Sequence, residues 1–201
     1  MGCILLEKVT FETDIMNEHM FDGCSKLSDI TFNSPTTITT IPAYCFNNCE
    51  KLSELSLLKA NSTTGELLSN VTSIGESAFN NTSFPEIHIT HTVSVGANAF
   101  SNMKGLLIVS VNTNDSNNKI NISQEMFFHS PTLTTVTIGA NVGTVGARAF
   151  AQCTSLVNIT IQNGNIGDYM FDQDTALAAY ICASSFGSVT RPISIMDLLA
   201  L

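Results

Sequence analysis

Residues 145–161 read VGARAFAQCTSLVNITI, and the pattern in this stretch decides the fold. From Phe150 onward, apolar or small side chains recur as F-x-x-C-x-x-L-x-x-I-x-I. The closing Ile159–Ile161 alternates apolar and polar types, which predicts a short strand with one buried face. Ahead of the phenylalanine, Gly146 permits a tight turn, and we expect a single helical or 3-10 turn to carry Ala149 and Phe150 inward.

The same pattern recurs along the chain, and each copy is anchored on a phenylalanine. The seven anchors, 21 to 33 residues apart, are Phe21, Phe46, Phe79, Phe100, Phe127, Phe150 and Phe171. Cys3, Leu6, Val9 and Phe11 match the second half of an eighth copy, whose phenylalanine would precede residue 1. A unit this small cannot bury its own apolar face, so the repetition predicts a solenoid of stacked copies.

The repeats predict the domain organisation. Residues 1–182 form the array, with a partial first copy and seven further copies, and their strands stack in parallel about 4.8 Å apart. Residues 183–201 break the motif and form a tail that could cap the last copy with a short amphipathic helix. The sequence shows no polar cap before the first copy, so we expect a fragment of a longer array or a truncated chain.

Composition excludes several classes of protein. The chain has 201 residues, with 8 Lys and Arg against 17 Asp and Glu, and a formal net charge of −9. Phosphate binding requires clustered cations, so nucleic acid is not an expected partner. With 44% hydrophobic and 12% charged residues, the chain is expected to fold. No apolar run reaches the roughly 18 to 20 residues of a transmembrane segment, and no signal peptide is visible.

Most cysteines share one column, meaning one motif position compared across the copies. Cys3, Cys24, Cys49 and Cys153 occupy it, and Thr82, Met103, Ser130 and Asp174 replace them in other copies. A column that accepts such residues is expected to hold small, largely buried side chains, and free cysteine packs there as a small hydrophobe. Disulfides between consecutive members are a less favoured alternative. Zinc is less favoured still, because Cys45 and Cys49 lack a second cysteine pair.

The unit A-F-x-x-C-x-x-L-x-x-I-x-I, preceded by Ile-Gly or Val-Gly, resembles the BspA-type leucine-rich repeats of bacterial and protist surface proteins. Ile74–Phe79 (IGESAF) and Val145–Ile161 are close matches, and about residues 3–182 are covered. The resemblance implies a β-rich, α/β-type leucine-rich-repeat solenoid. In such a fold a parallel sheet lines the concave face, with short helical or 3-10 turns and short strands opposite. It also implies a secreted or cell-surface module for adhesion or protein interaction, without catalytic residues.

No group of residues indicates an enzyme, a cofactor or a metal site. His88 and His91 span a strand end and would face opposite sides, so a solvated strand end is favoured. Asp168, Asp172 and Asp174 lack the order of a calcium loop, and a solvated turn is favoured. The sequence contains no nucleophile-elbow, zinc-protease or phosphate-loop motif. We expect a non-enzymatic protein, with an unrecognised hydrolase as a remote alternative.

The candidate binding residues form the outward column between the two inward residues of each strand. They are Thr31, Ser56, His88, Ser110, Thr137 and Thr160. A neutral, hydrogen-bonding surface of this kind suits a protein or glycan partner. The column also has a structural explanation, because threonine favours strands and stacked like charges repel.

Two connections are longer than the others, and their extra segments are Lys59–Asn70 and Asn112–Asn121. Insertions on one side of an array often bind partners, but surface loops also lengthen at little cost, so both interpretations stay open. The sequence favours binding through the concave sheet face and the inserted loops. The alternative is a structural fragment of a longer repeat protein that has no partner.

Overall fold

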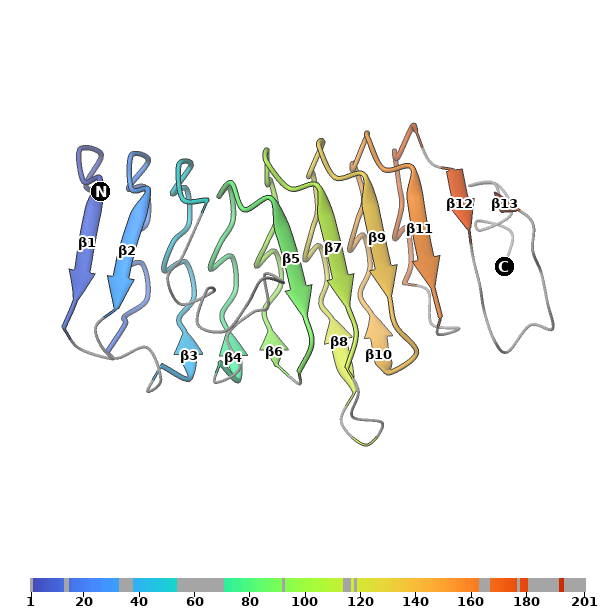
Figure 1. Cartoon of the computed structure of the whole chain (residues 1–201), viewed down its shortest axis with the longest axis horizontal. Coiled ribbons are helices and arrows are strands. Elements are labelled where there is room, and N and C mark those ends of the chain that lie inside the picture. The colour runs from blue at the N-terminus through green and yellow to red at the C-terminus, as the bar shows by residue number, and fades with distance from the viewer. Residues whose placement is uncertain are drawn as a thin grey trace.

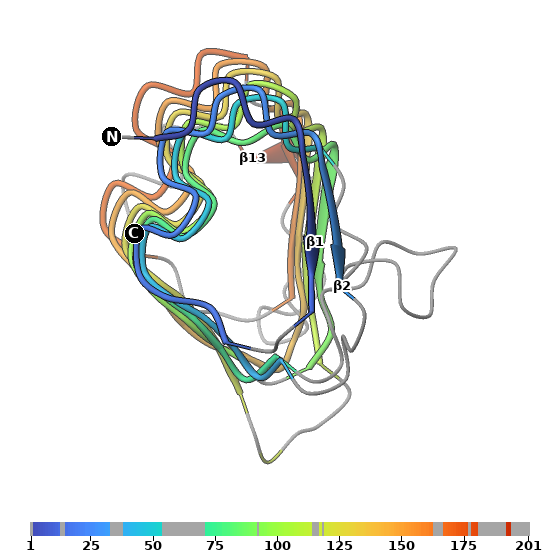
Figure 2. The ribbon, with the colours of Figure 1, turned by 90° about the vertical axis from the view of Figure 1, so that its left-hand side faces the viewer.

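The computed structural model describes residues 2–12, 15–32, 38–53, 71–91, 93–113, 117, 119–162 and 167–176, and the strand segments 178–180 and 192–193. These residues form a solenoid whose coils follow one another along one axis (Figure 1). Seen along that axis, corresponding segments of successive coils overlie one another (Figure 2). The predicted solenoid is therefore confirmed.

The strands that close each motif copy stack in parallel and form a broad wall. They are β1 (Lys8–Phe11), β2 (Asp29–Phe32), β5 (Glu86–Ile89), β7 (Ile108–Val111), β9 (Thr135–Ile138), β11 (Asn158–Ile161) and β12 (Ala178–Tyr180). Strand β1 pairs with β2, and β5, β7, β9, β11 and β12 pair in that order. The strand position of the copy anchored on Phe46, which falls between β2 and β5 in the sequence, lies outside the described residues.

Strands that precede the phenylalanine turns, several of them only two residues long, form a second wall. Strands β3 (Thr40–Ile41), β4 (Ser73–Ile74) and β6 (Ser94–Val95) pair in parallel, as do β8 (Ile120–Ile122) and β10 (Val142–Val145). Each places apolar residues in the core, as Ile41 and Ile74 show with 1% and 2% exposure. The predicted short strands are present, and the interior lies between the two walls (Figure 2).

The phenylalanine turns are tighter than a helix. In the turn of Phe46, the Asn47 N–H donates to the Tyr44 carbonyl at 3.2 Å, an i→i−3 bond like that of a single 3-10 turn. The residues two before and two after the anchor, Tyr44 and Asn48, take positive φ angles of 57° and 58°. Because residues with positive φ interrupt the turn on both sides of the anchor, the turn cannot continue as a helix. None of the described residues lies in a helix.

The alternating turn backbone also joins neighbouring copies. The Phe46 N–H donates to the Ala78 carbonyl of the next copy at 2.9 Å, and the N–H groups two residues before and after it donate to the Glu76 and Asn80 carbonyls. This triplet recurs at all six junctions from the Phe21 copy to the Phe171 copy. Because each copy satisfies the peptide groups of its neighbour, the turns are stabilised by stacking.

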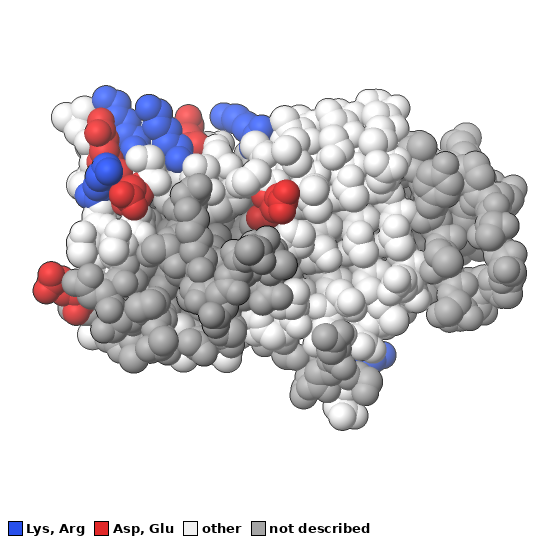
Figure 3. Space-filling view, viewed as in Figure 1, with Lys and Arg blue, Asp and Glu red and all other residues white. Residues whose placement is uncertain are grey.

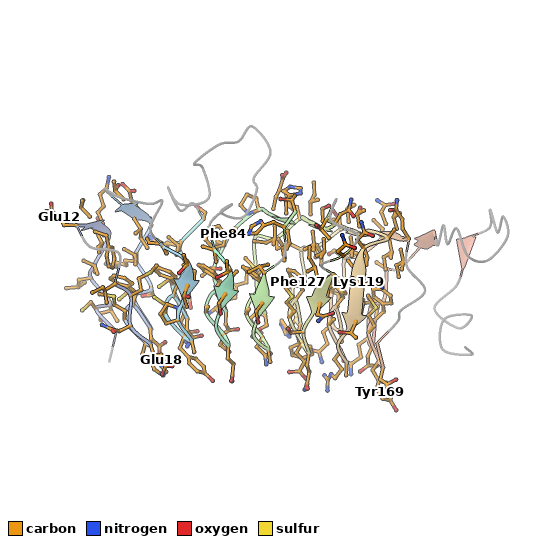
Figure 4. All side chains as sticks on the ribbon, turned by 90° about the horizontal axis from the view of Figure 1, so that it is seen from below. Glu12, Glu18, Phe84, Lys119, Phe127 and Tyr169 are labelled. Atoms are coloured by element: carbon orange, nitrogen blue, oxygen red, sulfur yellow. The ribbon has the colours of Figure 1, made fainter. Side chains whose placement is uncertain are left out.

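The anchoring phenylalanines form one continuous stack through the core. Consecutive rings from Phe21 to Phe171 have centroids 5.1 to 6.1 Å apart and interplanar angles of 5° to 23°. Figure 4 shows Phe127 among the interior side chains, whereas Glu18 and Tyr169 project from the edge. The anchors of successive copies therefore line up, as a solenoid of stacked copies requires.

The cysteine column lies in the core from Cys24 to Asp174, whereas its first member, Cys3, is exposed. The described cysteines are all free thiols: Cys3, Cys24, Cys45, Cys49 and Cys153. Cys49 Sγ donates to the Phe21 carbonyl at 3.1 Å, and Thr82 Oγ1 donates to the Phe79 carbonyl at 2.8 Å. Cys49 and Thr82 therefore satisfy their donors within the column, whereas the equally buried Met103 has no donor and Ser130 Oγ has no partner.

The last copy departs from the sequence alignment by one residue. Strand β12 pairs Ala179 with Ile159, so Ala179 takes the register position that the motif assigns to Tyr180. The segment from Phe171 to this position is one residue shorter than in the preceding copy, as it also is after Phe79. The shorter connection between turn and strand therefore shifts which residue enters the pairing, and β12 stays in register with β11.

The two ends of the array differ. Strand β13 (Pro192–Ile193), the only described part of the tail, pairs antiparallel with β12. At the other end, Leu6 and Val9 are only partly buried, whereas Leu27 and Ile30 in the next copy are 0% exposed.

The parts of the chain that the structure describes contain no helix with the length and apolar character of a membrane span.

Candidate binding surface

The strand register places four of the predicted residues side by side on the outside of the broad wall. We call this set the strand face; it comprises His88 on β5, Ser110 on β7, Thr137 on β9 and Thr160 on β11. The residues beside Ser110 on its strand, Val109 and Val111, are both 0% exposed and point into the core. The alternation therefore turns the strand face outward, as the motif predicts.

The other two predicted residues are not joined to the strand face by the described residues. Thr31 is exposed on β2 and pairs with Thr10 of β1. Ser56 lies outside the described residues. Ser56 therefore stays a prediction, and Thr31 is assigned only its exposed position on the neighbouring pair of strands.

The surface around the strand face carries little charge. The flanking column holds Glu86, Ile108, Thr135 and Asn158, of which only the first is charged. In Figure 3, no Lys, Arg, Asp or Glu appears on the described surface over β7, β9 and β11. Charged side chains gather instead near β1 and β2, where Lys8 Nζ lies 3.4 Å from Asp29 Oδ2. Contacts on the strand face would therefore depend on shape and neutral hydrogen bonds.

His88 is the ionisable member of the strand face. Its Nε2 lies 3.1 Å from Oε2 of Glu86, two residues earlier on the same strand. Both side chains are partly exposed, so this pair contributes little to folding stability. It gives the β5 end of the strand face a carboxylate and an imidazole that the β7, β9 and β11 positions lack.

His88 and His91 make separate contacts. His91 Nε2 lies 2.9 Å from the Val71 carbonyl, an arrangement that requires the nitrogen to carry the proton and donate. His88 is oriented by Glu86 instead. Among the described residues, no three His, Cys, Asp or Glu side chains are grouped to hold a metal ion.

The expected solvated turn at Asp168, Asp172 and Asp174 is wrong for Asp174, which is 2% exposed. Its Oδ1 accepts the Cys153 N–H at 2.6 Å, and its Oδ2 is buried without a partner. Burial raises the pKa of Asp174 to about 8. The carboxyl therefore enters the cysteine column as a neutral acid near pH 7, because the column position, not the residue type, determines its burial.

The sequence analysis missed a row of side-chain hydrogen bonds along the turns. Asn47 Nδ2 donates to Asp22 Oδ1 at 2.8 Å, and Asn80 Nδ2 donates to Asn47 Oδ1 at 2.7 Å. Ser101 Oγ then donates to Asn80 Oδ1 at 2.7 Å. The available signal was an Asp or Asn directly after three successive anchors. This row links copies away from the strand face and stiffens the stack.

The inserted loops are described only in part. Lys59–Asn70 lies outside the described residues. Near the ends of Asn112–Asn121, Asn141 Nδ2 donates to the Thr113 carbonyl at 2.7 Å, and Asn121 Oδ1 accepts the Thr144 N–H at 2.9 Å. The second insertion is therefore held to the neighbouring copy at both ends, and a binding role for either loop stays a prediction.

Two solved structures share this architecture. One is a leucine-rich repeat protein from Bacteroides ovatus ATCC 8483, 20% identical, with a TM-score of 0.60 over 90% of this chain and 57% of that one. The other is a leucine rich cell surface protein from Faecalibacterium prausnitzii A2-165, 19% identical, with a TM-score of 0.54 over 98% of this chain and 63% of that one. The chain spans less than two thirds of either, and at these identities the likeness shows the fold alone.

The family assignment rests on the repeats themselves. The model of the BspA type leucine rich repeat region matches residues 1–71 and 72–191, in six copies. None of the curated proteins compared with the chain matches it. Because the family model covers nearly the whole chain and the structure shows its stacked units, the chain belongs to the BspA-type leucine-rich-repeat family.

Proposed function

We propose that the chain is a non-enzymatic binding module of a surface protein, which holds a protein partner on the strand face. The observation that carries this proposal is the register of His88, Ser110, Thr137 and Thr160 on four neighbouring strands. On each strand, the residues directly before and after the strand-face residue are almost fully buried. The strand face is therefore held in place by a packed core. A surface ordered before binding loses little conformational entropy when a partner docks.

The chemistry of the face supports a neutral interface. Ser110, Thr137 and Thr160 offer hydroxyl groups on short side chains, which lose less rotamer entropy than long ones when immobilised. Ile108, partly exposed in the flanking column, adds apolar area beside them. A glycan is the second partner class, because hydroxyl groups hydrogen-bond sugars as readily as peptides.

A surface location is proposed on two grounds. The family is that of the BspA-type repeats, whose members include surface proteins, and the Faecalibacterium prausnitzii protein of the same fold is a cell surface protein. A protein outside the cell would meet matrix proteins, receptors or glycans. These are therefore the partners to test first.

The test is direct binding of the full chain to purified extracellular-matrix proteins and to a glycan array. The double variant Ser110→Lys, Thr137→Lys should weaken capture of any partner found by at least about tenfold, which is ~1.4 kcal/mol. The matched control is Thr40→Lys, Ser94→Lys, which places the same charges at exposed strand positions of the second wall. Equal loss in both variants, or loss in neither, would contradict binding through the strand face.

The binding experiment and two further measurements address the alternatives. A folded, monodisperse chain that captures nothing would support the partnerless structural fragment. Once a partner has been found, a variant with a shortened Lys59–Asn70 segment tests the inserted loops, because its binding to that partner is compared with that of the wild type. A hydrolase would be detected by a broad activity screen with and without divalent metal ions.

A further inference from the structure

Cys3 and Cys24 occupy the same column in neighbouring copies, and the fold brings these copies into direct contact. Strand β1 pairs with β2 at the same offset of 21 residues that separates the two cysteines. The residues just before them, Gly2 and Gly23, also touch, because a Cβ added at Gly23 would lie 3.5 Å from the Gly2 Cα. Parallel segments about 4.8 Å apart fall within the Cα separation of roughly 4.4–6.8 Å that a disulfide spans.

The local turns direct both side chains the same way. The Leu6 N–H donates to the Cys3 carbonyl at 2.9 Å, and the Leu27 N–H donates to the Cys24 carbonyl at the same distance. A disulfide needs the two Cβ atoms slightly closer than stacked segments place them. The first copy can supply that movement, because Leu6 is only partly buried.

The two thiols belong to adjacent segments but differ in access. Cys3 is exposed, whereas Cys24 is 2% exposed. Burial raises the pKa of Cys24, a hydrogen bond with the Cys3 backbone lowers it, and the neighbouring Cys3 thiol raises it. The pair therefore combines an exposed thiol that a small reagent can reach with a buried thiol beside it.

The other described thiols nearby do not share this arrangement. Cys49, the next member of the column, is 0% exposed and donates to the Phe21 carbonyl at 3.1 Å. Burial raises the pKa of Cys49 to about 12. Cys45 is also 0% exposed, lies outside the column, and has its pKa raised to about 12 by burial. Both are shielded from an external oxidant.

We propose that Cys3 and Cys24 form an intramolecular disulfide when the chain meets a small disulfide such as oxidised glutathione. The Cys3 thiolate attacks one glutathione sulfur, which forms a mixed disulfide and releases one glutathione thiolate. Cys24 then gives its proton to water, and its thiolate attacks Cys3 Sγ and expels the second glutathione thiolate. Two protein thiols are oxidised, and one small disulfide is reduced to two thiols.

The disulfide would fasten the first, partial copy to the second. Closing the loop between the two cysteines restricts the unfolded chain, so the oxidised protein should unfold at a higher temperature than the reduced protein. The site is independent of the strand face, and its test does not depend on finding a binding partner.

The experiment equilibrates the reduced full chain with oxidised glutathione and maps its disulfides by mass spectrometry of peptides. The wild-type chain should yield a Cys3–Cys24 linkage. Cys24→Ser should stop at a mixed disulfide between Cys3 and glutathione, and Cys3→Ser should leave Cys24 unmodified. The matched control Cys49→Ser, which changes the next member of the column, should form the same linkage as the wild type.

Three outcomes would overturn the proposal. They are a wild-type chain that keeps Cys3 as a stable mixed disulfide, one that stays fully reduced, and one that links Cys24 to another cysteine. Circular dichroism checks that each variant folds, and serine is acceptable in this column because Ser130 is buried there. If Cys24→Ser fails to fold, Cys24→Thr replaces it, since Thr82 occupies the same column.

Discussion

The first copy and the central copies carry the same motif but differ in burial. Leu106 and Val109, in a central copy, are both 0% exposed, whereas Leu6 and Val9 at the matching positions are only partly buried. The central residues have a copy on each side, and those of the first copy are covered on one side by the described structure. Burial in this fold is therefore supplied by neighbouring copies, and similar residues contribute differently at the end and in the middle.

The largest expected effect is at the aromatic stack. Phe127→Ala should lower the free energy of unfolding by about 3–5 kcal/mol, because a fully buried ring leaves a cavity between two stacked neighbours. Phe21→Ala should cost less, because Phe21 retains 7% exposure near the end of the array. Urea denaturation measures both values, and equal losses would mean that end and centre are packed alike.

The leucine column gives the next largest effect. Leu133→Ala should cost about 2–5 kcal/mol, and Leu6→Ala should cost less than about 1 kcal/mol because its side chain already meets solvent. Thermal unfolding by circular dichroism compares the two. A Leu6→Ala loss as large as that of Leu133→Ala would contradict the nearest-neighbour account.

The same comparison explains what could be predicted from the sequence. The Phe stack and the outward positions of Ser110, Thr137 and Thr160 follow from repetition, because each copy supplies the template for the next. The positive φ values at Tyr44 and Arg148 could not be predicted from the sequence, since neither residue type favours them. They result from the hydrogen bonds between copies.

The site was predictable in position and not in chemistry. Alternation fixes which side chains face outward, but the motif does not encode which partner, if any, they would contact. Asp174 shows the opposite conflict, because its residue type predicts exposure while its column predicts burial. The column prevails, since the stacked backbone leaves that position no access to water.

Asp174 gives a pH dependence at the C-terminal end of the array. Its folded pKa of about 8 is above the ordinary 3.8, so the folded state binds the proton more tightly than the unfolded state. Stability should be highest below about pH 4 as far as this group is concerned, fall as the pH rises toward 8, and level off above it. Asp174→Asn should flatten this part of the melting-temperature profile between pH 5 and pH 9.

The matched control for this prediction is Asp168→Asn, which changes an exposed carboxylate in the same copy. Its profile should follow the wild type. An Asp174→Asn profile that also follows the wild type would show that the buried carboxyl is not protonated in the folded chain.

The smallest expected effect concerns salt. Because the strand face over β7, β9 and β11 is uncharged, capture of a partner there should change by less than roughly threefold between about 50 mM and about 500 mM NaCl. A partner held near Lys8 and Asp29 on β1 and β2 would instead be released as salt increases. Biolayer interferometry at several salt concentrations distinguishes the two regions.

A double-mutant cycle on the phenylalanine stack tests the central claim most directly. Phe100 and Phe127 are adjacent rings with centroids 5.7 Å apart, and Phe150 is one ring further along. Replacing the adjacent pair with leucine, singly and together, should give a coupling energy of about 0.5–1.5 kcal/mol. The Phe100 and Phe150 pair should be additive within about 0.5 kcal/mol. Additivity for the adjacent pair, or equal coupling for both pairs, would contradict a continuous stack stabilised by nearest neighbours.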